Sequence, residues 1–475
     1  EYYVHLSGQK QELEIEPIYE AHDELFSPEA VSALREEREG ATAEQRGRAG
    51  ALLQFAVDGH LGLQTRAEEA ELARLEATEE VAIGAERHPY RGVAVAMANE
   101  VDPSIRAELE AARNGVLADR LNPVHRASIE RTHDAVSALG WPSYLAAYED
   151  LRGIDLRRLA DEALAFIHAT DGVYESSLAP ALAATGVPAL GELRRSDLPR
   201  FFRAPELDGP FAADRLLPAL ERTLEGIGID LRGQANVHVD AESRPTKSPR
   251  AFCATPRVPD EVYLVIAPTG GRDDYAALFH EAGHAEHYAH VDPGLPFEFR
   301  HLGDNTVTES FAFLLEHLTN DPSWLDAVLG VSQTDAIVAH ARAVKLLMLR
   351  RYAAKIAYEV ELHAPGADLD ALRLRYGQLL ESATRVGWPD VSWLSDVDSG
   401  FYVACYLRAW ALETRWRAAL RERFGASWFA SADAGDWLRR LWSEGQRLGG
   451  DELLSAQLGE GLHLEVLAQE LAAGD

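Results

Sequence analysis

Apolar residues recur every three or four positions along much of the chain, which is the spacing of helices with one buried face. Three examples are residues 67–85, 155–169 and 336–358, which are rich in Ala, Leu, Glu and Arg. Runs typical of strands are rare, and the clearest is the β-branched and aromatic segment Val262–Ile266. The sequence therefore predicts a mainly α-helical protein with a small amount of sheet.

The chain has 475 residues, which is enough for two or three domain-sized units. Residues 194–209 are rich in charge and proline, and residues 240–256 carry three prolines together with Ser, Thr and Lys. We therefore predict a boundary near residue 195. It separates an N-terminal helical region, 1–195, from a second region, 196–475.

The second region contains the pattern H-E-x-x-H at His280, Glu281 and His284. Residues four apart share one face of a helix, so the two imidazoles can bind one zinc ion together. Glu281 lies at the edge of that face, where it can take a proton from a zinc-activated water. The pattern predicts that 196–475 is the catalytic region of a zinc metallopeptidase with one Zn²⁺ per chain.

The surrounding residues predict that this pattern lies on a helix. The segment Pro268–Gly271 breaks the chain after the strand at Val262–Ile266. Asp273 and Asp274 then offer an N-cap and first-turn negative charge to a helix that runs to His290. A strand beside the zinc helix is useful because its edge can hold an extended peptide by main-chain hydrogen bonds.

A catalytic zinc site needs a third protein ligand, and the sequence offers two candidates. Glu309 lies on a second predicted helix, Thr306–His317, whose other residues are mostly apolar. The alternative is His290, at the spacing of H-E-x-x-H-x-x-G-x-x-H, but that pattern needs glycine where this chain has His287. We predict Glu309 as the third ligand.

These motifs resemble those of the thimet oligopeptidase and oligopeptidase F family, the M3 metallopeptidases. Residues 280–287 are similar to its H-E-x-G-H-x-x-H, and Glu309 and Glu316 to its E-x6-E on the next helix. Phe401–Tyr406 resembles the F-Y-V-x-x-Y of the oligopeptidase F branch, so the resemblance covers about 245–410. It implies a helical, two-lobed fold with a small sheet beside the zinc helix. It also implies a central channel that admits short peptides.

Tyr402 and Tyr406 are four apart on a predicted helix, so their phenol groups share a face. Such hydroxyls can stabilise a developing oxyanion, and the resemblance implies this role, shared with a nearby histidine. The chain has no histidine between Trp388 and Tyr402; Asp396 and Asp398 occupy that region instead. With Glu281, the two tyrosines are the predicted catalytic residues, although both also suit a helical core.

Several further residues bear on the site. His287 either orients a ligand or faces solvent. Asp304, His301 and Glu316 are further candidates for residues that hold the metal ligands in place. Cys253 and Cys405 lie in apolar settings that favour inert packing over nucleophilic chemistry.

Composition narrows the partners and the location. A net charge of −31 argues against nucleic-acid binding and against anionic membranes. No segment approaches the roughly 18 apolar residues of a membrane helix. Two cysteines give no disulfide framework, and the first residues show no signal peptide, which favours the cytoplasm. The oligomeric state is not indicated.

We therefore predict hydrolysis of peptide bonds in short peptides by a zinc-activated water, with Glu281 as general base. Two alternatives stay open. One is a Taq-type metallocarboxypeptidase, which shares H-E-x-G-H and a later glutamate. The other is a catalytically silent, metal-stabilised peptide-binding protein, although a purely structural zinc site has no need of a general base.

Overall fold

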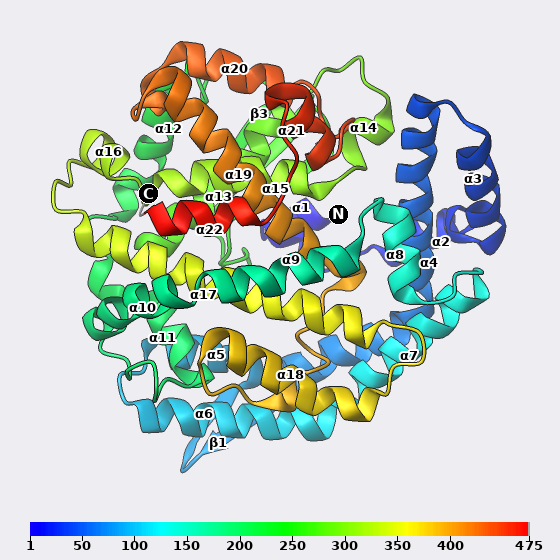
Figure 1. Cartoon of the computed structure of the whole chain (residues 1–475), viewed down its shortest axis with the longest axis horizontal. Coiled ribbons are helices and arrows are strands. Elements are labelled where there is room, and N and C mark those ends of the chain that lie inside the picture. The colour runs from blue at the N-terminus through cyan, green and yellow to red at the C-terminus, as the bar shows by residue number, and fades with distance from the viewer. Residues whose placement is uncertain (474–475) are drawn as a thin grey trace.

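The computed structural model describes residues 1–473, and α-helices make up most of this part of the chain (Figure 1). The prediction of a mainly helical protein is confirmed. The N-terminal helices are α1 (Tyr2–Leu6), α2 (Glu16–Ala21), α3 (Pro28–Gly40), α4 (Ala43–Thr78), α5 (Val93–Asn99), α6 (Pro103–Val116), α7 (Asn122–Ala138), α8 (Tyr144–Arg152), α9 (Leu156–Ala169) and α10 (Asp171–Thr185). The later helices are α11 (Leu198–Arg203), α12 (Leu216–Gly226), α13 (Arg272–Ala289), α14 (Phe297–His301), α15 (Asn305–Leu318), α16 (Pro322–Trp324), α17 (Asp335–Leu362), α18 (Leu369–Thr384), α19 (Tyr402–Phe424), α20 (Ala432–Trp442), α21 (Gly450–Leu458) and α22 (Glu465–Ala473).

A three-stranded sheet lies directly before α13 in the chain. It consists of β3 (Val237–Asp240), β4 (Phe252–Arg257) and β5 (Glu261–Val265), in the order β3-β5-β4. Strand β3 is parallel to β5 and β4 is antiparallel to it, so β4 forms one edge. Helix α13 packs against both β4 and β5. The predicted small sheet beside this helix is therefore confirmed.

The predicted helix over residues 67–85 is wrong at its end. Helix α4 stops at Thr78, and β1 (Glu80–Ile83) pairs with β2 (Glu86–Pro89) as an antiparallel hairpin. A two-residue turn joins the strands, and its Gly84 has a φ of +57°, which glycine adopts without strain. The surrounding Ala- and Glu-rich sequence concealed this turn.

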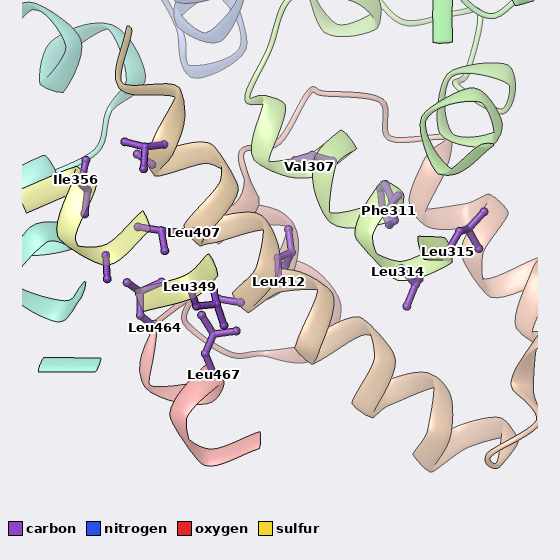
Figure 2. Close-up of a cluster of buried hydrophobic side chains, with 14 of the residues drawn as sticks. Val307, Phe311, Leu314, Leu315, Leu349, Ile356, Leu407, Leu412, Leu464 and Leu467 are labelled. Carbon is purple, nitrogen blue, oxygen red and sulfur yellow. The ribbon is translucent and has the colours of Figure 1, made fainter. Parts of the chain in front are cut away.

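Helix α15 lies between α13 and α19 and is buried along most of its length. Its apolar residues recur at the helical spacing, and α15 packs against α19, which in turn packs against α17 and α22 (Figure 2). The residues labelled there are Val307, Phe311, Leu314 and Leu315 from α15, Leu407 and Leu412 from α19, Leu349 and Ile356 from α17, and Leu464 and Leu467. This packing fixes the polar residues that α15 carries on its other face.

Gly283 allows α13 and α15 to approach each other closely. A Cβ atom at this position would lie 2.5 Å from both Ala312 Cα and the carbonyl oxygen of Phe311. Because these are backbone atoms, they could not yield without separating the helices. Any larger residue at position 283 would move the side chains of α13 away from those of α15.

One continuous set of buried apolar residues extends from Val31 to Leu471. It includes residues on both sides of position 195, and the boundary proposed there stays a prediction. Within residues 1–473, no helix combines the length and the apolar character needed to cross a membrane.

Candidate metal and catalytic site

The structure brings His280, His284 and Glu309 together, and we call these three residues the His–His–Glu triad. Glu309 Oε2 lies 3.4 Å from His280 Nε2 and 3.7 Å from His284 Nε2. One ligand atom from each residue lies within 4.8 Å of the other two. The two histidines come from adjacent turns of α13, and Glu309 comes from the first half of α15.

Neighbouring side chains hold each member of the triad in place. His280 Nδ1 is hydrogen-bonded to Glu316 Oε2 at 2.8 Å, and His284 Nδ1 to Thr308 Oγ1 at 2.8 Å. These contacts leave Nε2 of each ring facing Glu309. The sequence indicated Glu316 as a possible supporting residue, whereas Thr308 was not predicted. Its position directly before Glu309 was the available signal.

The triad fits a zinc ion. Glu309 is 5% exposed, and its Oε2 has no hydrogen-bond partner among residues 1–473. A buried carboxylate oxygen is normally satisfied, so its position between two imidazole nitrogens suits coordination. Ligand atoms around a tetrahedral zinc are roughly 3.3 Å apart. The two nitrogen–oxygen distances are close to this separation, and the donor set is one that zinc prefers.

The charges around the triad favour a cation at the same point. Burial alone would lower the pKa of His280, but the neighbouring carboxylates of Glu309 and Glu316 outweigh it and raise that pKa to about 10. Burial lowers the pKa of His284 to about 4. Burial also acts to raise the pKa of Glu309, but the two histidines keep it below its ordinary value. The two carboxylates thus attract positive charge to the space between the rings.

Glu281 follows His280 on α13, and its carboxylate reaches the edge of the sheet. Its Oε2 accepts a hydrogen bond of 2.8 Å from the backbone N–H of Cys253 on the edge strand β4. Burial raises the pKa of Glu281 to about 7. A carboxylate with a pKa near neutrality is well suited to exchange protons during a reaction.

The two predicted catalytic tyrosines have different surroundings. The hydroxyl of Tyr402 donates a hydrogen bond of 2.8 Å to Glu309 Oε1, on the oxygen opposite the one that faces the histidines. Tyr406 lies one turn further along α19 and lines a cavity beside His280. Gly400 and Phe401, which precede the helix, have φ values of +63° and +55°. This tight turn sets the direction in which α19 starts.

The cavity beside His280 has a volume of about 900 Å³. One wall is aromatic and consists of Phe313, Tyr352, Tyr406 and Trp410. The rings of Phe313 and Trp410 stack with their centroids 4.6 Å apart. The rest of the lining includes many polar and charged side chains, among them His280, Glu316 and Lys345. A concave space that combines apolar and polar groups is the usual form of a ligand site.

Other residues that the sequence singled out lie outside the triad. His290 Nδ1 is hydrogen-bonded to the backbone carbonyl of Glu286 at 2.9 Å, and its ring packs against Trp442. His287 is fully buried, so of the two alternatives for this residue the solvent-facing one is wrong. Asp304 caps α15 by accepting from the N–H of Thr306.

Three more of these residues have structural contacts of their own. His301 Nε2 is 3.4 Å from the N–H of Val258. Burial raises the pKa of both Cys253 and Cys405, in keeping with the inert packing expected for them. None of the three belongs to the triad.

No family model matches the chain, and no curated protein matches it. Its fold is similar to the crystal structure of a "putative oligoendopeptidase F from Bacillus anthracis str. Ames". The TM-score is 0.70 and the sequence identity 15%, with 100% of this chain and 87% of that chain covered. At this identity the likeness concerns the fold, and it extends over the whole chain.

Proposed function

We propose that the chain is a zinc-dependent peptidase that hydrolyses short peptides. The observation that carries the proposal is the buried Oε2 of Glu309, which has no hydrogen-bond partner among the described residues and faces Nε2 of His280 and of His284. The similarity of the whole fold to a protein described as an oligoendopeptidase F supports the same reaction class.

His280, His284 and Glu309 would hold the zinc ion. Bound there, zinc would polarise the scissile carbonyl group and make water more acidic. Glu316 and Thr308 orient the two imidazoles, while Tyr402 orients Glu309. The sequence predicted a direct catalytic role for Tyr402, whereas its hydrogen bond supports a positioning role.

Glu281 and Tyr406 would act on the substrate. Ionised Glu281 takes a proton from the attacking water and then delivers it to the leaving amine. The hydroxyl of Tyr406 can donate a hydrogen bond to the carbonyl oxygen of the scissile bond, which becomes an oxyanion when water attacks. Hydrolysis by this route needs no covalent bond between the enzyme and the peptide.

The conservative variant Glu281→Gln tests the proposal. It removes the proton acceptor while keeping the size of the side chain, so hydrolysis should fall about 10²–10⁴-fold. The measurements are cleavage of a mixed peptide library by mass spectrometry and zinc content by elemental analysis. Zinc should stay at one ion per chain in both proteins. Full activity of the variant would refute the mechanism.

The same library separates the alternatives. A Taq-type carboxypeptidase would remove single C-terminal residues, and a blocked C-terminus would stop it. An oligoendopeptidase would cut internal bonds of blocked peptides. A silent metal-stabilised protein would bind zinc and peptides but leave every peptide intact.

A further inference from the structure

A second cavity lies next to the one beside His280. It has a volume of about 400 Å³, and Phe202 and Met348 form part of the wall of both cavities. Helix α17 separates the two regions: Tyr352 faces the first cavity and Arg351 the second. In Figure 1, α6, α11 and α18 lie on the opposite side of α17 from α13 and α15. The two cavities are therefore neighbours on either side of α17.

Most charged side chains in the second cavity have a partner of opposite sign. Arg195 Nη1 lies 2.8 Å from Glu110, and Arg351 pairs with Asp396. Glu76 Oε2 is 3.5 Å from a guanidinium nitrogen of Arg91. Asp396 also lies 3.7 Å from Lys355, so its negative charge is fully compensated.

Arg113 is the exception among the described residues. Its guanidinium lies 4.8 Å from the ring centroid of Tyr90, and no carboxylate is within ion-pair distance. Its buried Nη1 has no hydrogen-bond partner in residues 1–473. The cavity therefore has one positive charge outside the ion pairs of the described chain, and His125 adds none because burial lowers its pKa to about 4.

Ser392 gives a second, independent indication. It is 4% exposed, lines the same cavity, and its hydroxyl has no hydrogen-bond partner in the described part of the chain. A buried hydroxyl without a partner is uncommon and costs free energy. The cavity thus combines two unsatisfied donors, one neutral and one charged, and this combination matches a carboxylate group.

We propose that the second cavity binds a carboxylate of the peptide substrate through Arg113 and Ser392. The proposal rests on the proposed peptidase function, because the carboxylate belongs to the peptide held beside the triad. The C-terminal carboxylate and the side chain of an acidic residue share this chemistry. Either one would anchor the peptide at a fixed distance from the scissile bond.

Binding to the Glu281→Gln variant measures this contact without hydrolysis. The probes are fluorescent peptides of four to ten residues, each prepared as the free acid and as the C-terminal amide. At the length that spans both cavities, the amide should bind roughly tenfold more weakly. Arg113→Gln in the same background should weaken the free acid to the level of the amide.

Matched peptides and variants identify the source of the carboxylate. If an acidic side chain is the ligand, an internal Glu-to-Gln change in the peptide lowers affinity instead, and the effect again disappears with Arg113→Gln. Ser392→Ala should give a smaller loss of the same kind. Arg222→Gln removes one exposed positive charge that lines neither cavity, and it should keep the full discrimination.

The result that overturns the proposal is an affinity that depends on neither carboxylate, or on a carboxylate but not on Arg113. Lack of any peptide binding overturns it as well. These outcomes are separate from failure of the proposed function. Discrimination by Arg113 without hydrolysis by the wild-type protein would retain the carboxylate site and refute the peptidase. Hydrolysis by the wild-type protein without any dependence of affinity on the carboxylate and Arg113 would retain the peptidase and refute the carboxylate site.

Discussion

Two charged clusters adjoin the cavity beside His280. They differ in whether all of their charged atoms have a partner. The His–His–Glu triad leaves Glu309 Oε2 without a hydrogen-bond partner in the described chain. The second cluster, which we call the ion-pair cluster, consists of Lys345, Glu413, Arg417 and Glu470, three of which line the cavity. Both clusters are buried and contain carboxylates, yet only the first has the open donor set that a metal needs.

The ion-pair cluster balances its charges internally. Lys345 Nζ lies 3.0 Å from Glu470 and 3.5 Å from Glu413, and Arg417 Nε lies 2.6 Å from Glu413 and also pairs with Glu470. Burial acts to raise the pKa of both carboxyls, but the two cations keep those values below the ordinary one. Two cations and two anions that satisfy one another indicate a structural role for this cluster.

Of the changes that test this difference between the clusters, loss of Glu309 should have the largest effect, and the effect is on zinc affinity. Glu309→Ala removes one of three ligands, so zinc affinity should fall more than about 100-fold, which exceeds the effect of losing an outer-shell partner. Titration with a competing chelator measures it. His290→Ala is the matched control and should bind zinc like the wild type, because His290 is bonded to the backbone of α13. The reverse result would make His290 the third ligand.

Loss of Glu470 should affect stability but not the metal. Glu470→Gln leaves Lys345 and Arg417 with half of their compensating charge in a buried setting. The free energy of unfolding should fall by about 3 kcal/mol, measured by urea denaturation. Glu71→Gln breaks an exposed pair with Arg74 and should leave stability unchanged. If the fully folded Glu470→Gln variant bound less zinc than the wild type, the distinction between the two clusters would be wrong.

The triad could be predicted from the sequence because each half is local. Helical spacing alone places His280 and His284 on one face, and the apolar pattern of residues 306–317 predicts the helix that carries Glu309. The close contact between Gly283 and α15 could not be predicted from the sequence, because it depends on how closely the two helices pack. The hydrogen bond from Tyr402 to Glu309 joins residues 93 apart.

The second cavity could not be predicted either, because only the folding of the chain brings its residues together. Arg113 comes from α6 and Ser392 from the segment after α18, and an arginine without a partner looks like any other arginine in a sequence. The resemblance implies a histidine near Tyr402, and the fold shows what the residues that stand there do. Asp396 and Asp398, which occupy that region, pair with Arg351 and Lys355.

Separate replacement of the two tyrosines tests which of them supports the triad and which acts on the substrate. Tyr402→Phe removes the hydroxyl that orients Glu309, so zinc affinity should fall about tenfold. Tyr406→Phe should keep that affinity and lower kcat about 10–100-fold, with little change in KM. Chelator titration and steady-state kinetics on one peptide distinguish the two roles. An equal loss of kcat in both variants, with zinc unaffected, would restore both tyrosines as oxyanion donors.

The dependence of activity on pH tests Glu281, which follows His280 on α13 and is hydrogen-bonded to the sheet. Glu281 accepts a proton only when it is ionised, so kcat/KM should fall as the pH drops through its pKa. Burial raises that pKa from 4.5 to about 7, and a bound dication would lower it again. The acid limb should therefore lie between these two values, with a slope approaching tenfold per pH unit. A profile that stays flat down to pH 4.5 would show that another group accepts the proton.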